Sequence, residues 1–263
     1  MIAKLREENP IVHCITNHVV SNFQANGLLA VGASPIMGEA PEEAAELASM
    51  AGAVSLNIGT LNAQTLQSML IAGKTANELN IPVVLDPVGV GATAFRAEAA
   101  NKILTELKVS VLRCNAGELA AICEAEWKGK GVDAGSGEAN IKKLAVEAAK
   151  KLQLIVAVTG EIDIVTDGHE VVEIPFGHPV MSKITGSGCL LSATVAAFLA
   201  VHPEDELHAT AEALRFYALA GEKASEAGIN PGTFQSEFLN QLYLMKAANS
   251  ESKTTSEEGV EKL

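Results

Sequence analysis

The sequence lacks the cysteine pairs by which a zinc site or a disulfide framework is recognised. Its 4 cysteines are scattered, with no C-x-x-C pair, and this distribution is typical of reduced thiols. His13, Cys14 and His18 are close together in the chain, but the first two are neighbours in an expected strand and therefore point to opposite faces of the sheet. These residues do not predict a metal site.

Positive charge is also scarce. Lys and Arg number 19 against 32 Asp and Glu, which gives a formal net charge of -13. Nucleic-acid binding draws on clustered basic residues, so a small molecule is the expected ligand and nucleic acid is not. The longest apolar run, residues 189–201, is too short to span a bilayer, and the charged N-terminus has no signal-peptide core. We expect no membrane partner and a cytoplasmic location.

What the chain does have is a regular alternation of short apolar runs with longer helical patterns. The strand-like runs are residues 11–16, 54–58, 82–86, 109–112 and 154–159. Between them lie helical patterns at residues 44–50, 61–79, 96–107 and 139–152. Because most of the strands are apolar on both faces, the pattern predicts an α/β fold in which helices cover both sides of a mostly parallel sheet.

The second half of the chain departs from strict alternation. Asp167-Gly168 suits a tight turn and predicts an edge hairpin of residues 162–166 and 170–174. Helices are expected from Ser187 onward and over residues 205–227 and 235–246. We expect one domain over residues 1–249 and a polar, disordered tail over residues 250–263. The polar stretch 127–137 is either a linker between helices or a loop that orders over a ligand.

Gly186 and Gly188 precede the longest apolar run of the chain. The two glycines allow a tight turn with unobstructed N–H groups, and the buried helix that starts at Ser187 points its positive dipole end at that turn. This arrangement predicts a phosphate site. The plainer alternative is a glycine-rich turn in front of a core helix.

Polar side chains follow the expected strands at the edge where ligands of parallel sheets bind. Arg113 offers a guanidinium fork suited to phosphate oxygens. Asn115 and Glu118, in N-x-x-E spacing, present oxygens of the kind that Mg²⁺ prefers. The same spacing also forms a helix capping box, and the sequence leaves both interpretations open.

Asp86 and the pair Thr159-Gly160 end two further strands. Asp86 is either a second partner of the cation or the cap of the turn that follows. Thr159 and Gly160 present a hydroxyl and a backbone N–H to a nucleotide, or they form a turn.

One motif points to other functions. Residues 89–94 match the dinucleotide fingerprint G-x-G-x-x-A, with Arg113 placed to read the 2′-phosphate of NADP. Against an oxidoreductase, the motif lies in the middle of the chain and no acidic residue ends the next strand. A nucleotide-binding module without catalytic activity is a further alternative.

Taken together, three of these motifs resemble the ribokinase-like superfamily of small-molecule kinases: R-x-N-x-x-E at 113–118, T-G at 159–160 and T-G-S-G-C at 185–189. Most members of that superfamily have Asp where this chain has Cys189. The variant with Cys resembles the hydroxyethylthiazole kinase family. Four further motifs of that family are T-N-x-V-x-x-N at 16–22, G-A-S-P-x-M at 32–37, L-N-x-G-T at 56–60 and D-P-V-x-x-G-A at 86–92.

The resemblance implies roles for individual residues. The thiazole would lie against Asn17, Val19, Met37 and the Gly186 turn. The ATP-binding residues would be Asp86, Arg113, Asn115, Thr159 and Gly160. Glu118, with Asp86 nearby, would hold Mg²⁺. The N–H groups of residues 186–189, which include Gly186, Gly188 and Cys189, would stabilise the transferred phosphoryl group. Cys189 would stand where the superfamily has its general base.

The resemblance also implies a ribokinase-like α/β/α sandwich and an ATP- and Mg²⁺-dependent kinase of 4-methyl-5-(2-hydroxyethyl)thiazole in thiamine salvage. It implies a homotrimer with active sites between subunits. A helix N-terminus lowers the pKa of a thiol whereas a nearby γ-phosphate raises it, so Cys189 is expected to play only a minor part in proton transfer. A related kinase acting on hydroxymethylpyrimidine or pyridoxal is the alternative within the superfamily.

Overall fold

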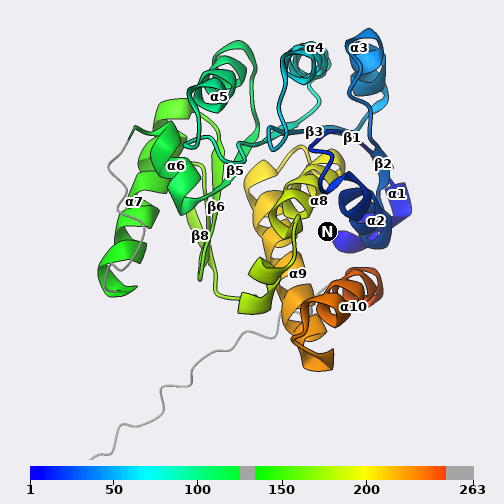
Figure 1. Cartoon of the computed structure of the whole chain (residues 1–263), viewed down its shortest axis with the longest axis vertical. Helices are drawn as coiled ribbons and strands as arrows, with labels where there is room; N and C mark the ends of the chain where they lie inside the picture. Colours follow the sequence, from blue (N-terminus) through cyan, green and yellow to red (C-terminus); the bar gives the residue numbers. More distant parts are fainter. Residues whose placement is uncertain (125–133, 247–263) are drawn as a thin grey trace, which may run out of the picture.

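The computed structural model describes residues 1–124 and 134–246, built around one eight-stranded sheet with the strand order β2-β1-β3-β4-β5-β6-β7-β8 (Figure 1). The strands from β2 to β6 are parallel, and β7 and β8 add an antiparallel hairpin at the edge. The strands are β1 Ile11–Ile15, β2 Ser34–Ile36, β3 Ala53–Asn57, β4 Val83–Asp86, β5 Val111–Asn115, β6 Ile155–Thr159, β7 Asp163–Thr166 and β8 Val171–Ile174. The expected tail 250–263 and most of the stretch 127–137 lie outside the described residues.

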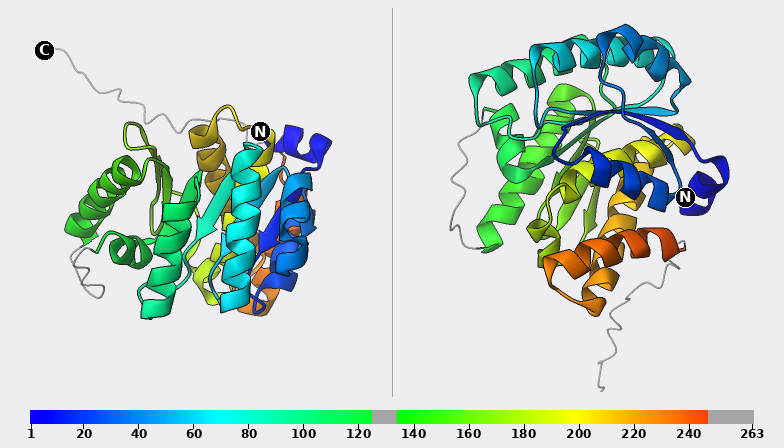
Figure 2. Two further views of the ribbon diagram at one scale, coloured as in Figure 1. Left: turned by 90° about the horizontal axis from the view of Figure 1, so that it is seen from above. Right: turned by 45° about the vertical axis from the view of Figure 1, so that its right-hand side comes forward.

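Helices cover both faces of the sheet, as predicted. One face carries α3 Pro41–Met50, α4 Ala63–Glu78, α5 Ala94–Glu106, α6 Ala116–Ile122 and α7 Ala134–Leu152. The other carries α1 Ile2–Glu8, α2 Ser21–Val31, α8 Ser187–Val201, α9 Glu206–Ala227 and α10 Pro231–Leu244, with the short 3₁₀ helix η1 Pro179–Lys183 before α8. Each layer shares its own hydrophobic core with the sheet, and Figure 2 shows the sheet between the two layers.

Helix α8 is the centre of the second layer. It packs on β1, β3 and β4 and is enclosed by α1, α2 and α9, so almost all of its side chains are buried. A helix that is apolar on every side is expected in such a position. None of the helices in residues 1–124 and 134–246 is long and apolar enough to cross a membrane.

Strand β5 differs from the sequence-based expectation in a way that shapes the site. It continues to Asn115 instead of ending at residue 112, because residues 111–115 pair with β6 in register. Arg113 is therefore a buried residue within a strand and does not lie in the loop that follows. The sequence pattern did not predict α1, α2, β2 or η1, whereas the capping-box interpretation of Asn115 and Glu118 placed a helix start where α6 begins.

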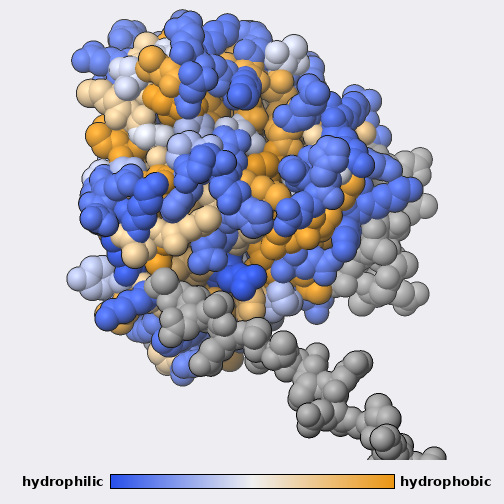
Figure 3. Space-filling model, turned by 180° about the vertical axis from the view of Figure 1, so that it is seen from behind, coloured by the Kyte–Doolittle hydropathy of each residue, from blue (hydrophilic) through white to orange (hydrophobic). Residues whose placement is uncertain are grey.

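The surface retains some apolar side chains. On the side opposite to Figure 1, hydrophobic areas lie between hydrophilic ones (Figure 3). Val19, a predicted substrate contact, is 64% exposed, and Met37 is 36% exposed. Both side chains are therefore available to a ligand or to another subunit.

Candidate active site

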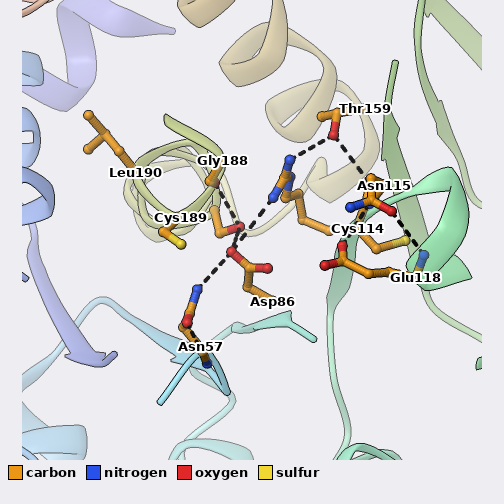
Figure 4. A network of polar contacts seen from close by, with 12 residues as sticks. Asn57, Asp86, Cys114, Asn115, Glu118, Thr159, Gly188, Cys189 and Leu190 are labelled. Atoms are coloured by element: carbon orange, nitrogen blue, oxygen red, sulfur yellow. Dashed lines mark hydrogen bonds and ion pairs between the residues drawn. The ribbon is translucent and has the colours of Figure 1, made fainter. Parts of the chain in front are cut away.

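The carboxyl ends of β3 and β4 place Asn57 and Asp86 beneath the first turn of α8 (Figure 4). Arg113 of β5 lies beside Asp86. Asp86 is fully buried. Its Oδ2 atom accepts hydrogen bonds from Asn57 Nδ2 at 2.9 Å and from Ser192 Oγ at 2.8 Å, and lies 3.7 Å from Arg113 Nη1. Burial raises the pKa of Asp86 to about 6, although Arg113 opposes the shift. Asp86 is thus the centre of a buried polar network.

Arg113 lies directly under the start of α8, with a side chain that is almost fully buried. Its Nη2 atom donates to Thr159 Oγ1 at 2.7 Å. A Cβ atom at Gly188 would lie only 2.8 Å from Arg113 Nη1, so glycine is what lets the helix approach the guanidinium. A planar cation against a glycine backbone at a helix N-terminus is suited to binding phosphate oxygens.

The turn before α8 has the geometry that the sequence predicted for an anion site. Gly186 is the N-cap residue, with a φ of 89°, in the left-handed region that favours glycine. Within the described residues, no acceptor is bound by the N–H groups of Ser187, Gly188 or Cys189, as expected for the first turn of a helix. These three donors lie next to Arg113 and are available to an anion.

Asn115 and Glu118 form a capping box at the start of α6. Asn115 Oδ1 accepts from the backbone N–H of Glu118, and Glu118 Oε2 accepts from that of Asn115, both at 2.9 Å. Glu118 Oε1 also accepts from Gly89 N at 2.9 Å, which ties the turn after β4 to α6. The N–H of the first glycine in the dinucleotide-like motif is therefore occupied. Each carboxylate oxygen of Glu118 keeps lone pairs beyond these bonds.

Thr159 and Gly160 mark the end of β6 beside Arg113. The Thr159 hydroxyl accepts from Arg113. The N–H of Gly160, which the sequence offered to a nucleotide, donates to Asp163 Oδ1 at 2.9 Å. Burial raises the pKa of Asp163 to about 6, with the Gly160 hydrogen bond acting in the opposite direction. Asp163 was not singled out from the sequence, because it begins the edge hairpin and belongs to no motif.

A cavity of about 740 Å³ opens beside this cluster, a volume within the usual range for a small-molecule site. Arg113, Thr159 and Gly188 form part of its wall. The rest of the wall comes from the hairpin, the segment that joins it to η1, η1 itself, α8 and α9, including Asp163, Phe176, His178, Met181 and Tyr217. The cavity therefore begins at the anion site and extends toward apolar and aromatic side chains.

Of the three predicted thiazole contacts outside the Gly186 turn, the structure brings only Asn17 into the network. Asn17 is 5% exposed, and its Nδ2 atom donates to Asn57 Oδ1 at 2.9 Å and to Cys189 Sγ at 3.4 Å. Val19 and Met37 lie on the surface.

Cys189 is a thiol and not a thiolate near neutral pH. Burial raises the pKa of Cys189 to about 11, and the carboxylate of Asp86 acts in the same direction. The minor role of Cys189 in proton transfer stays a prediction.

Two carboxylates of the site, Asp86 and Glu118, have oxygens available to a cation. In residues 1–124 and 134–246, no three His, Cys, Asp or Glu side chains are grouped so as to hold a metal by themselves. Asp86 Oδ1 is buried and has no hydrogen-bond partner among these residues, and Glu118 carries a second carboxylate nearby. This set fits Mg²⁺ that arrives with phosphate ligands and keeps waters, and does not fit a fully protein-bound ion.

The sheet order, with an anion site at its carboxyl edge, is that of the ribokinase-like α/β fold. A ribokinase-like superfamily protein from Enterococcus faecalis is similar in fold, with a TM-score of 0.62 at 14% identity over 92% of this chain and 94% of that chain. A pyridoxal kinase from Staphylococcus aureus gives a TM-score of 0.57 at 15% identity over 81% and 88%. These two similarities concern the fold alone.

A more similar structure is that of hydroxyethylthiazole kinase protein from Pyrococcus horikoshii, with a TM-score of 0.86 and 42% identity over 93% of this chain and 91% of that chain. The sequence model of the hydroxyethylthiazole kinase family matches residues 2–248 of this chain. The chain therefore belongs to the hydroxyethylthiazole kinase family, which confirms the fold and the family expected from the sequence motifs.

Proposed function

We propose that the protein transfers the γ-phosphoryl group of ATP to the hydroxyl of 4-methyl-5-(2-hydroxyethyl)thiazole, as a cytoplasmic enzyme of thiamine salvage. One observation carries the proposal within this kinase family. The free N–H groups at the start of α8 stand over Arg113, between Asn17 on one side and the 740 Å³ cavity on the other. The anion site thus lies between a cavity large enough for a nucleotide and the polar side chain of Asn17, where the substrate alcohol would bind.

In this reaction the alcohol oxygen attacks the γ-phosphorus in line, the bond to the β,γ-bridging oxygen breaks, and ADP leaves. Phosphoryl transfer asks mainly for positioning and charge stabilisation from a protein. The N–H groups of Ser187, Gly188 and Cys189 and the Arg113 guanidinium would stabilise charge on the transferred oxygens. The hydroxyl proton passes to a phosphoryl oxygen or to water, since the Cys189 thiol is not ionised.

We place Mg²⁺ with the ATP phosphates, near Glu118 and Asp86. The ion would neutralise phosphate charge when bound. Asp86 Oδ1 is a buried oxygen without a partner in the described part of the chain, and Glu118 Oε1 and Oε2 each accept a single hydrogen bond. Both carboxylates therefore have capacity for a cation or for its waters.

Glu118→Gln is expected to raise the Mg²⁺ concentration for half-maximal activity by about tenfold, because one charged ligand is lost. Glutamine keeps one acceptor for the capping box but loses the hydrogen bond from Gly89 N, so the thermal stability of the variant is measured alongside its activity. Glu106→Gln is the matched control, since Glu106 pairs with Lys74 on the surface, away from the site. An unchanged Mg²⁺ titration for Glu118→Gln would remove this residue from the metal role.

Cys189→Asp is expected to keep or increase kcat. The change places a carboxylate where most relatives in the superfamily carry one, and the native thiol is protonated near neutral pH because its pKa is about 11. Steady-state kinetics of the variant, with Cys189→Ser as the neutral comparison, test this expectation. Loss of all turnover in both variants, with nucleotide binding intact, would show that the thiol itself is needed.

We also propose that the active form is a homotrimer with sites at subunit interfaces. The two exposed predicted substrate contacts, Val19 and Met37, support this assembly, because a bound thiazole would need further protein to cover it on that side. Light scattering on the purified protein gives the oligomeric state. A monomer with full activity would rule out the assembly.

The function is tested by ADP release from MgATP. Hydroxyethylthiazole is compared with hydroxymethylpyrimidine, pyridoxal and a control without acceptor. Release that requires the thiazole supports the proposal. Release with another acceptor would preserve the kinase and change the substrate, and no release from folded protein would favour a nucleotide-binding module.

A further inference from the structure

Two buried amide side chains, Asn17 and Asn57, connect Asp86 to Cys189 in a single line of hydrogen bonds. Asn57 donates from Nδ2 to Asp86 Oδ2 at 2.9 Å. Its Oδ1 atom accepts from Asn17 Nδ2 at 2.9 Å, and Asn17 Nδ2 also donates to Cys189 Sγ at 3.4 Å. Asn57 is 1% exposed and Asn17 is 5% exposed, so neither amide exchanges partners freely with water.

The orientation of the Asn57 amide is fixed by two hydrogen-bond partners, one that can only accept and one that can only donate. An ionised carboxylate only accepts hydrogen bonds, so the Asn57 NH₂ group faces Asp86. On the other side, the backbone N–H of Gly59 donates to Asn57 Oδ1 at 2.9 Å, and a backbone N–H only donates. These two constraints are independent, and both exclude the flipped amide.

The fixed Asn57 amide then fixes Asn17. Because Asn57 presents an oxygen, Asn17 must turn its NH₂ group toward Asn57, and its second N–H meets the Cys189 sulfur. Both donors of Asn17 are then used, and Asn17 Oδ1 is left as an acceptor to which no residue of the described chain donates. A Cβ atom at Gly59 would lie 2.7 Å from Asn17 Nδ2, so Gly59 provides the room for this arrangement.

We propose that Asn57 is a positioning residue that holds Asn17 so that Asn17 Oδ1 accepts a hydrogen bond from the hydroxyl of the acceptor substrate. This inference rests on the proposed function. The thiazole substrate has a single hydrogen-bond donor, its hydroxyl, because the ring nitrogen and sulfur are only acceptors. The free oxygen of Asn17 therefore selects the reacting group of the substrate and rejects the ring atoms.

The same network links the phosphate site at Arg113 to the substrate site at Asn17. Asp86 Oδ2, which orients Asn57, is also the oxygen nearest to Arg113 Nη1. The carboxylate thus holds the cation of the phosphate site and, through two amides, the acceptor for the substrate hydroxyl. Because Asn17 contacts Cys189 in the first turn of α8, the alcohol oxygen would be held beside the N–H groups of that turn, where the phosphoryl group is transferred.

The first test needs only the wild-type protein. Affinities of 4-methyl-5-(2-hydroxyethyl)thiazole and of its 2-fluoroethyl analogue, which has nearly the same shape but no donor, are measured by calorimetry. Leaving the Asn17 oxygen without a donor in the complex, where the ligand displaces water from it, should weaken the analogue by about tenfold or more. Equal affinities would overturn the inference, whatever the behaviour of any variant.

The second test uses Asn57→Leu, which removes the hydrogen bonds that fix the orientation of Asn17 and keeps the side-chain volume similar. Asn17 is then free to turn, and the preference for the hydroxyl should fall to about threefold or less. Ser192→Ala is the matched control, because it removes the other hydrogen bond to Asp86 Oδ2 and leaves both constraints on Asn57 in place. That control should keep the wild-type preference.

The readouts separate the two proposals. If the wild type forms no ADP with the thiazole, the proposed function fails. If it turns the thiazole over, but Asn57→Leu keeps the full preference for the hydroxyl over fluorine, Asn57 does not set the orientation and only this inference fails. Binding of ATP to each variant, expected to match the wild type, reports that the fold is retained.

Discussion

Replacing Arg113 by methionine is expected to lower kcat/KM for ATP by about 1000-fold. Arg113 lies against Gly188 in the first turn of α8, and it is held in place by Thr159 and Asp86. In a site that excludes water, such a fork stabilises the charge of the transferred phosphoryl group far more than a surface arginine would. Steady-state kinetics with varied ATP measure the loss.

The variant has a second effect that a control must remove. Without Arg113, the fully buried Asp86 loses its counter-charge, and stranding one partner of a buried pair destabilises a protein by about 3–5 kcal/mol. The double variant Arg113→Met with Asp86→Asn is neutral, so its thermal stability should recover relative to the single variant. Its activity should stay well below that of Asp86→Asn alone, which is measured in parallel because Asp86 is itself placed near Mg²⁺. Recovery of activity along with stability would mean that Arg113 acts only by supporting the fold around Asp86.

The fold was largely predictable because its strands are short, apolar and separated by helical patterns. The predicted strands correspond to β1, β3, β4, β5 and β6, and the expected hairpin is β7 and β8. Strand β2 could not be found this way: its three residues include Pro35 and pair only at the sheet edge, where proline is tolerated. The predicted strand stopped before Arg113, because a charged residue is not expected inside a buried strand. Its burial is favourable only because Thr159 and Asp86, from distant segments, are its partners.

The candidate site was predictable where residues belong to motifs at strand ends. Asp86, Arg113, Glu118, Thr159 and Gly188 do lie at the same edge of the sheet, because the carboxyl ends of parallel strands meet there. Their functional roles remain predictions.

Ser192 and Asp163 could not be found from the sequence. Ser192 is one small residue inside an apolar helix, and its partner Asp86 comes from another part of the chain. Asp163 is bound to Gly160 across a turn that carries no recognised motif. The role of Asn57 depends on Asn17, Gly59 and Asp86 together, so local sequence could show only that a polar residue ends β3.

Gly186→Ala is expected to lower kcat by about 100-fold, because the change moves the N–H groups that bind the phosphoryl oxygens. At a φ of 89° an alanine is strained, and its Cβ atom would lie 2.7 Å from Val20 Cγ1 and 2.9 Å from Val20 Cβ. The first turn of α8 must therefore shift away from α2. KM for ATP and kcat, measured together, show whether the loss lies mainly in the transition state.

The chain offers a matched control for this strain. Gly168, in the turn between β7 and β8, has a φ of 93°, and a Cβ atom there would lie 2.6 Å from Lys150 Cγ. Gly168→Ala thus combines a similar backbone strain, about 1–2 kcal/mol, with a similar clash. It does so at the end of β7 that lies away from the carboxyl edge of β6. Equal loss of stability in both variants, with loss of activity only in Gly186→Ala, would identify the α8 turn as the catalytic anion site. Equal loss of activity would attribute the effect to stability alone.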